Sequence, residues 1–436
     1  MMTARVSKLQ QWMLGAACAL TMGGAAAHDM VPGKPQSAPI LIKGATLHTV
    51  SNGVLNNSDI LLKDGKIAAI GQQLAQPANT QVIDGNGKHV YPGLISTVSQ
   101  LGLREIESVR ATVDITEVGE DNPHLLAEVA YNPDSEIIPT IRANGITHVQ
   151  VTPSGYMLGG QSSVINLDAW NVDDGVVKSA VGVHLFWPSK PGYWVSKKRM
   201  PKALKAYHKR LDRLQDYFAQ SKRYATAYKA DKSIEQDIRW HAMLGLWNKE
   251  KTLFVHADAI NEIEQALRFE RSHDLNMVIV GGRDAWLARE QIATQKVPVI
   301  YTHAFGIPAR GDEDIDQAFK TPSQLKEAGI TVVIGYESAW DSRSLAFAAG
   351  MAAKYGLGKE AALEAITLTP AKLLGVDKNL GSLEIGKSAS IIITNGDVMD
   401  YQTHRVGQMF IDGREVDLNN RHRQLYEKYQ QKVAKK

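Results

Sequence analysis

Residues 91–103 read YPGLISTVSQLGL, a turn followed by a short apolar run and a glycine exit. Pro92 and Gly93 end whatever secondary structure precedes them. The run that follows is short, apolar and rich in small residues, which is typical of the first strand of a parallel barrel. Val98 and Gln100 are two residues apart, so both side chains leave the same face of a strand. The segment therefore predicts a buried barrel strand.

The composition is that of an ordinary globular protein. The chain has 436 residues, 44% hydrophobic and 22% charged, which is enough for a large core in one large or two modest domains. Its formal net charge is +3, and about +1 remains if Arg5 and Lys8 are removed with a signal peptide. A nearly neutral chain gives no argument for nucleic acid or an anionic membrane as a partner.

Residues 1–27 have the pattern of a secretory signal peptide. A basic start precedes a short apolar run, and small residues up to Ala27 offer a cleavage site. The run is about half the ~20 residues that a transmembrane helix needs, so we expect no transmembrane segment and a periplasmic or secreted protein. The only cysteine, Cys18, lies in this segment, and lipidation there is the alternative. After cleavage the chain has no thiolate to bind a metal.

Two strand-rich flanks suggest one composite β domain. Residues 40–92 alternate apolar and polar positions and carry a hairpin signal at Asp64-Gly65. A matching pattern lies in residues 377–418, with Asp412-Gly413 as its hairpin signal. The outer segments read as a flexible linker and a charged helical tail, at residues 28–39 and 419–436.

Between the flanks, residues 93–376 alternate strands and helices, which favours parallel βα units. About 280 residues suit a (β/α)8 barrel, whose usual size is about 250. A doubly wound open sheet is the alternative, but no glycine-rich phosphate loop follows an early strand to support it. Residues 200–250 interrupt this alternation of strands and helices with amphipathic helices, which we expect to lie over the barrel mouth or to form a solvated hairpin. Further strands are expected at residues 147–151, 253–256, 277–280, 298–301 and 330–334.

These segments resemble the amidohydrolase superfamily, in particular its imidazolonepropionase-like branch. The resembling motifs are PGLI at 92–95, HAD at 256–258, TPAKLLG at 369–375 and GSLEIGK at 381–387. The resemblance implies an α/β fold, a (β/α)8 barrel with a composite β-sandwich domain formed by the N- and C-terminal flanks. It also implies hydrolysis of carbon–nitrogen bonds in cyclic amide-like substrates, at a metal held by the carboxyl ends of the barrel strands.

The metal ligands of that family are largely replaced in this chain. The family's first barrel strand reads PGLIDAHSHLGL, and Ser96, Val98 and Gln100 stand where Asp, His and His are expected. In the sixth strand, Gly281 stands at the histidine of V-I-V-H-G. Val98 cannot bind a metal, and Gln100 offers only a neutral amide oxygen.

At two of the family's site positions this chain has a side chain that can bind a metal or transfer a proton. The resemblance places His256 at the strand-five ligand and Glu337 where a strand-eight aspartate shuttles protons. We therefore expect both as catalytic residues and as metal ligands, with a rim salt bridge as the alternative for Glu337. One imidazole and one carboxylate support tight Zn²⁺ poorly, so we expect one weakly bound divalent metal or none.

Further polar residues are expected to bind the substrate: Gln100, Gln161, His303, Asp341 and Arg343. His303 follows the seventh strand and precedes a loop similar to the family's L-P-x-x-x-D-E segment. Gln161 belongs to a glycine-rich loop, residues 159–163, that resembles the family's GGQ segment. The alternatives are a plain pocket wall for His303 and an ordinary turn for the loop.

Three functions stay open on these residues. The first is a hydrolase that uses Glu337, with His256 and His303 at a weak metal. The second is a catalytically inactive family member that binds a ligand or partners an active paralogue. The third is a metal-free hydrolase or isomerase built on Glu337, Asp341 and His303. The expected partner is a small molecule, and a homodimer and a heteromer both stay open.

Overall fold

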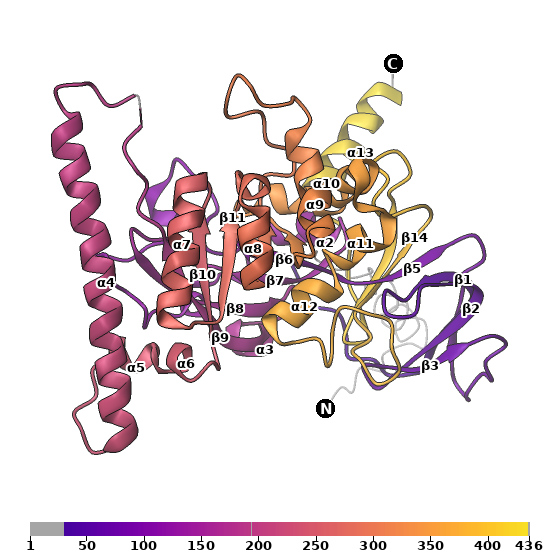
Figure 1. Ribbon diagram of the computed structural model, residues 1–436. Coiled ribbons are helices and arrows are strands. Elements are labelled where there is room, and N and C mark those ends of the chain that lie inside the picture. The colour runs from indigo at the N-terminus through magenta and orange to yellow at the C-terminus, as the bar shows by residue number, and fades with distance from the viewer. Residues whose placement is uncertain (1–29, 193, 435–436) are drawn as a thin grey trace, which may run out of the picture.

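Two eight-stranded sheets organise the chain (Figure 1). The computed structural model describes residues 30–192 and 194–434. The expected signal peptide, its cleavage site and Cys18 therefore lie outside the described residues. Across the described ranges, no helix is long and apolar enough to cross a bilayer.

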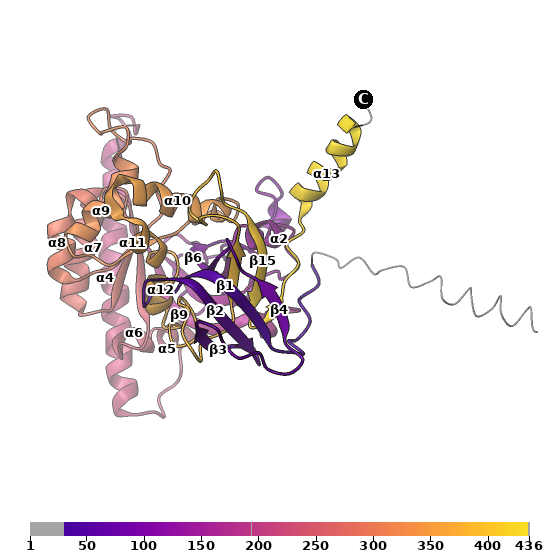
Figure 2. The ribbon, with the colours of Figure 1, turned by 90° about the vertical axis from the view of Figure 1, so that its right-hand side faces the viewer.

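The first sheet combines both flanks of the chain, as expected for a composite domain (Figure 2). Its strands are β1 (Ile40–His48), β2 (Val54–Lys63), β3 (Lys66–Gly71), β4 (Gln81–Asp84), β5 (His89–Pro92), β14 (Ile391–Thr394), β15 (Val406–Ile411) and β16 (Arg414–Glu415). Strand β5 pairs with β14 and joins the two flanks. The β2–β3 and β15–β16 turns have positive φ at Asp64-Gly65 and Asp412-Gly413, as a two-residue hairpin requires. Side chains from both flanks, among them Leu47 and Phe410, form a separate core.

The second sheet nearly closes into a barrel, which confirms the predicted barrel architecture. Its strands, in order, are β6 (Leu94–Ser99), β7 (Ile146–Val151), β8 (Leu158–Asn166), β9 (Val176–Phe186), β10 (Thr252–Ala257), β11 (Met277–Gly281), β12 (Val299–Tyr301) and β13 (Val332–Ile334). Beyond the ends of β6 and β13, the Gln100 backbone N–H donates to the Glu337 carbonyl at 2.9 Å. Val98, Phe254 and Val333 belong to the core inside the barrel.

One strand of the barrel runs against the others. Strand β8 is antiparallel to both β7 and β9, whereas the sequence predicts a loop at residues 159–163. That prediction is wrong, since residues 159–163 lie within β8. The strand runs antiparallel because only residues 152–157 connect β7 to β8, too few for a crossover to a parallel strand. Gly160 serves close packing rather than loop flexibility, since a Cβ there would lie 2.8 Å from the Leu125 carbonyl oxygen.

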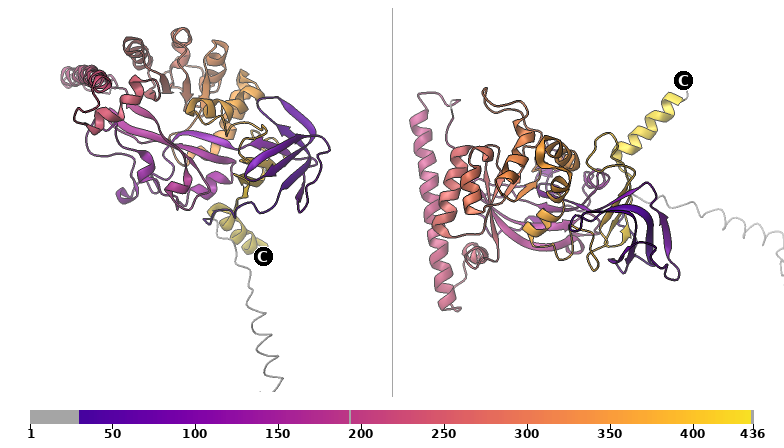
Figure 3. Two further views of the ribbon diagram at one scale, coloured as in Figure 1. Left: turned by 90° about the horizontal axis from the view of Figure 1, so that it is seen from below. Right: turned by 45° about the vertical axis from the view of Figure 1, so that its right-hand side comes forward.

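Helices cover the barrel on the side of β10 to β13 (Figure 3). The covering helices are α4 (Met200–Ala230), α7 (Ile260–His273), α8 (Arg289–Gln295), α9 (Gln317–Glu327), α10 (Leu345–Ala352) and α11 (Lys359–Glu364). The other helices are α2 (Ile138–Arg142), α3 (Val172–Gly175), α5 (Ile238–Ala242), α6 (Leu244–Trp247), α12 (Leu368–Leu374) and α13 (Arg421–Ala434), and α13 projects away from the barrel (Figure 2). The expected insertion is α4 to α6, and α4 lies along the outside of α7 rather than over the mouth (Figure 1). The reason is its apolar face, where Phe218 packs edge-on against Phe269 of α7 at 4.8 Å between ring centroids.

Candidate active site

Polar side chains gather where the barrel strands end. His184 and His256 lie in β9 and β10, and Asp258, His303 and Glu337 follow β10, β12 and β13. Because these strands are parallel, their carboxyl ends meet at one end of the barrel. We call these five residues the mouth cluster.

A hydrogen-bonded chain connects three members of the mouth cluster. His256 Nδ1 lies 3.0 Å from Glu337 Oε1, and His256 Nε2 lies 2.9 Å from His184 Nδ1. Nε2 of His184 is buried without a hydrogen-bond partner among the described residues. A bare acceptor nitrogen is tolerated there better than an N–H group, so we assign the His184 proton to Nδ1. His184 then donates to His256, and His256 donates to Glu337.

Burial and ring packing fix the two imidazoles. His184 is fully buried and stacks on Phe254 at 4.7 Å, and the His256 ring stacks on Phe186 at 4.1 Å. Burial, followed by the neighbouring His256, lowers the pKa of His184 well below its ordinary value, so this imidazole is neutral. Burial raises the pKa of Glu337, but the hydrogen bond that its carboxylate accepts from His256 outweighs burial and leaves this pKa below its ordinary value. Glu337 is therefore an ionised carboxylate near neutral pH.

Asp258 occupies the space of the missing strand-six ligand. Gly281 has a φ of 95°, and a Cβ built on it would lie 2.5 Å from Oδ1 of Asp258. That oxygen accepts hydrogen bonds from His303 Nε2 at 2.6 Å and from the Arg283 backbone N–H at 3.3 Å. Burial raises the pKa of Asp258, but the hydrogen bond that it accepts from His303 outweighs burial, so this pKa is also lowered. A side chain at position 281 would have to displace this carboxylate.

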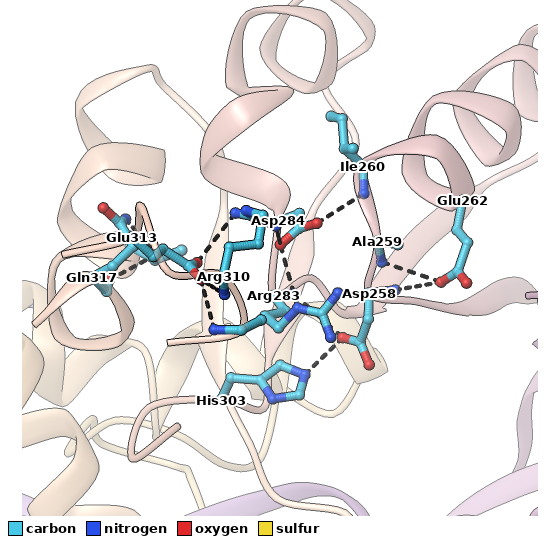
Figure 4. Close-up of polar contacts among 12 residues, drawn as sticks. Asp258, Ala259, Ile260, Glu262, Arg283, Asp284, His303, Arg310, Glu313 and Gln317 are labelled. Carbon is cyan, nitrogen blue, oxygen red and sulfur yellow. Dashed lines mark hydrogen bonds and ion pairs between the residues drawn. The ribbon is translucent and has the colours of Figure 1, made fainter. Parts of the chain in front are cut away.

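A buried carboxylate ties together the loops that carry these residues (Figure 4). Asp284, just beyond β11, accepts hydrogen bonds from Arg310 Nη1 at 2.9 Å and from Arg283 Nε at 3.3 Å. Its other oxygen accepts the backbone N–H of Ile260, the first residue of α7, at 3.1 Å. The loops that follow β10, β11 and β12 are thereby held in one arrangement. The Arg283 guanidinium lies beside Asp258 and His303 in the same view.

The mouth cluster does not fit a tightly held catalytic metal. Val98, at the first strand-one ligand position, is 1% exposed and packs in the barrel core, and Asp258 fills the space next to Gly281. Within residues 30–192 and 194–434, no group of three or more His, Cys, Asp or Glu side chains could hold a metal ion. Catalytic zinc sites commonly have three protein ligands. A weak metal on His256 and Glu337 stays a prediction, and it would have to displace the hydrogen bond between them.

The expected substrate-binding residues are spread more widely than the mouth cluster. His303 is in it, and the Gln100 backbone is bonded to that of Glu337. Asp341 and Arg343 lie in a short 3-10 turn after β13, where the Arg343 guanidinium sits 5.6 Å from the Trp340 ring centroid.

Gln161 faces away from the barrel interior. Its amide nitrogen donates to the Pro123 carbonyl at 2.9 Å, and its amide oxygen accepts from the Lys251 ammonium. The neighbouring Ser162 points to the opposite face of β8, where its hydroxyl meets Gln150 at 2.9 Å.

Sequence reasoning missed His184, Asp258 and Arg283 as site residues. His184 lies in V-V-K-S-A-V-G-V-H-L-F, residues 176–186, an unrecognised strand whose alternation after residue 180 was the available signal. Asp258 follows His256 directly in the HAD motif, but nothing local indicates that it replaces a strand-six ligand.

Known proteins resemble this chain in sequence and fold. Residues 289–416 match the family model of the Amidohydrolase family. The amidohydrolase tasK of Hapsidospora irregularis is 19% identical over 397 residues, which covers 81% of this chain and 39% of that protein. A deacetylase of Agrobacterium fabrum is 34% identical over 118 residues, 24% of this chain and 29% of the deacetylase. The chain thus spans less than half the length of either relative.

A solved structure extends the similarity to most of the fold. The crystal structure of an amidohydrolase from Thermotoga maritima has a TM-score of 0.76 and 24% sequence identity, over 87% of this chain and 99% of that one. At this identity the likeness shows the fold alone.

Proposed function

We propose that this chain, whose residues 289–416 match the family model of the Amidohydrolase family, hydrolyses carbon–nitrogen bonds in small cyclic amide-like substrates without a tightly held metal. The observation that carries the proposal is the hydrogen-bonded chain from Glu337 through His256 to His184. Barrels of this kind place their catalytic groups at the carboxyl ends of the strands, which is where these paired acid–base groups lie.

Glu337 is the general base of the proposed reaction. Its side chain is 46% exposed, so solvent and substrate can reach the carboxylate. Glu337 takes a proton from water while the water oxygen bonds to the carbonyl carbon, and the carbonyl oxygen becomes an oxyanion. When the oxyanion collapses, the carbon–nitrogen bond breaks and the proton passes from Glu337 to the leaving nitrogen.

The neighbours of Glu337 position it and supply charge. His256 donates to the carboxylate and keeps it ionised, and His184 holds the His256 ring in the required tautomer. As the cation for the oxyanion we assign Arg283, whose guanidinium lies beside Asp258 (Figure 4) and is held by its ion pair with Asp284.

The test is the hydrolysis of a panel of cyclic amides and N-acyl amino acids, followed by chromatography. We expect Glu337→Gln to lower kcat/KM by about 100-fold or more, because the amide cannot accept the proton. Glu327→Gln is the matched control, since Glu327 is an exposed glutamate at the end of α9, outside the mouth cluster and the expected substrate-binding residues. Wild-type turnover that survives in Glu337→Gln would contradict the proposal.

A second candidate is a family member that binds a ligand, or an active paralogue, without turnover. It is favoured by the burial of Val98 and by the filling of the Gly281 position, since both changes are built into the packing. In that case Glu337→Gln retains ligand binding in calorimetry, and no member of the panel is hydrolysed by the wild-type chain.

We also propose that the chain is exported. The support is the basic, apolar and small-residue pattern of residues 1–27. Mass spectrometry of the protein from fractionated cells should find a mature N-terminus at His28 in the periplasm or medium. Lipid attached at Cys18, or an intact Met1 in the cytoplasm, would contradict cleavage there.

A further inference from the structure

A groove of about 680 Å³ lies between α10 and the segment after β14. Its apolar lining comes from Phe305, Phe347, Met351, Met399 and Tyr401. Phe347 meets Tyr401 edge-on at 6.1 Å between ring centroids. Phe305 is 45% exposed and lies two residues after His303, so the groove opens beside the loop that carries part of the mouth cluster. A volume of this size is within the range of small-molecule sites.

The groove is lined in part by the end of α10 and the turn that follows it. The helix runs into a π-helical turn, Ala353–Leu357, in which Tyr355 and Gly356 leave helical geometry. Such turns are rare and are frequent at functional sites. Lys354, within this turn, lines the groove together with the apolar side chains.

Four charged side chains line the groove, and two of them, Lys354 and Asp400, form no ion pair within the described residues. The Lys359 ammonium forms an ion pair with Asp397 at 2.9 Å. The Asp400 carboxylate accepts two hydrogen bonds from its own turn, from the backbone and a hydroxyl of residues 402–403. Within the described part of the chain, Lys354 has no ion-pair partner inside 4.0 Å. The groove therefore presents an apolar floor and, in Lys354, an ammonium free to pair with a ligand, whereas both oxygens of Asp400 are already occupied by hydrogen bonds from its own turn.

We propose that this groove binds a small apolar carboxylate, an acid with an aromatic or branched aliphatic body. The body packs against Phe347 and Met351, and the carboxylate pairs with the Lys354 ammonium. An uncharged analogue keeps the apolar contacts but loses the ion pair. None of the residues that line the groove belongs to the mouth cluster, so ligand binding here does not depend on the proposed hydrolysis.

Calorimetry of the full chain with 4-phenylbutyrate and its neutral analogue 4-phenylbutyramide tests the site. We expect the acid to bind about fivefold more tightly than the amide, the effect of a partly exposed ion pair. Lys354→Gln should abolish this difference and leave amide binding unchanged. Met351→Ala should weaken both ligands. The control Lys326→Gln removes an exposed lysine on α9 that does not line the groove, and it should change neither affinity.

Three results would overturn the proposal. One is the absence of heat for both probes at millimolar concentration. Another is a Lys354→Gln variant that still prefers the acid. The third is loss of acid binding in His303→Ala with full binding in Lys354→Gln, which would place the ligand in the mouth cluster. Circular dichroism of each variant checks that the fold is retained.

Discussion

Replacing Gly281 with alanine tests whether the Asp258 carboxylate closes the strand-six ligand position. Gly281 has a φ of 95°, where an L-residue costs about 1–2 kcal/mol. Its new Cβ would lie 2.5 Å from Asp258 Oδ1, so the carboxylate must move and give up its bonds to His303 and the Arg283 N–H. Because the Asp258 side chain is 41% exposed, solvent screening reduces that loss to about 1 kcal/mol. We therefore expect the free energy of unfolding to fall by about 2–3 kcal/mol.

The assay is urea denaturation followed by tryptophan fluorescence, with two comparisons. Gly329 has a φ of 81° and nothing within 4 Å of its added Cβ, so Gly329→Ala should cost only the backbone term of about 1–2 kcal/mol. In an Asp258→Ala background the steric conflict is gone, and Gly281→Ala should cost the backbone term alone. Equal losses for Gly281→Ala and Gly329→Ala, or an unchanged loss in the Asp258→Ala background, would refute this reasoning.

Three further expectations concern the rest of the chain. Burial and the adjacent His89 lower the pKa of His48 from 6.5 to about 4, so the neutral ring stabilises the fold above pH 6.5 and this contribution is lost as the pH falls towards 4. In urea titrations, His48→Gln should reduce the pH dependence of stability within that window, and an unchanged dependence would count against it. Asp168 is fully buried in ion pairs with Arg142 and Arg414 at 3.3 Å, so Asp168→Ala should cost about 3–5 kcal/mol of unfolding free energy; a loss near that of an exposed site, under ~0.5 kcal/mol, would contradict this. Gln161→Ala should leave ligand affinity at the mouth within about twofold in calorimetry, because Gln161 bonds outside the barrel.

Local patterns predicted those parts of the fold that local interactions decide. The hairpins at Asp64-Gly65 and Asp412-Gly413 could be predicted from the sequence because a two-residue turn needs residues that accept positive φ. The existence and direction of strand β8 could not be predicted in the same way. Its direction follows from the shortness of residues 152–157, and its glycines serve contacts with a distant segment.

The candidate site shows the same division. His256, His303 and Glu337 could be named from their places after apolar strand segments, and the structure brings them to one end of the barrel. Their partners could not be predicted from the sequence. Only the folded structure brings Asp258, which follows β10, into the ligand position beside Gly281 of β11. The pairing of His184 with His256 spans 72 residues and depends on the register of β9 against β10.

The metal content of the mature chain tests the central claim most directly. Protein purified without chelator, before and after incubation with Zn²⁺ or Mn²⁺, is measured by elemental analysis alongside His256→Ala. We expect no stoichiometric metal in either protein, because Val98 and the Asp258-filled Gly281 position leave too few ligands. About one tightly held metal per chain, lost in His256→Ala, would contradict a metal-independent site.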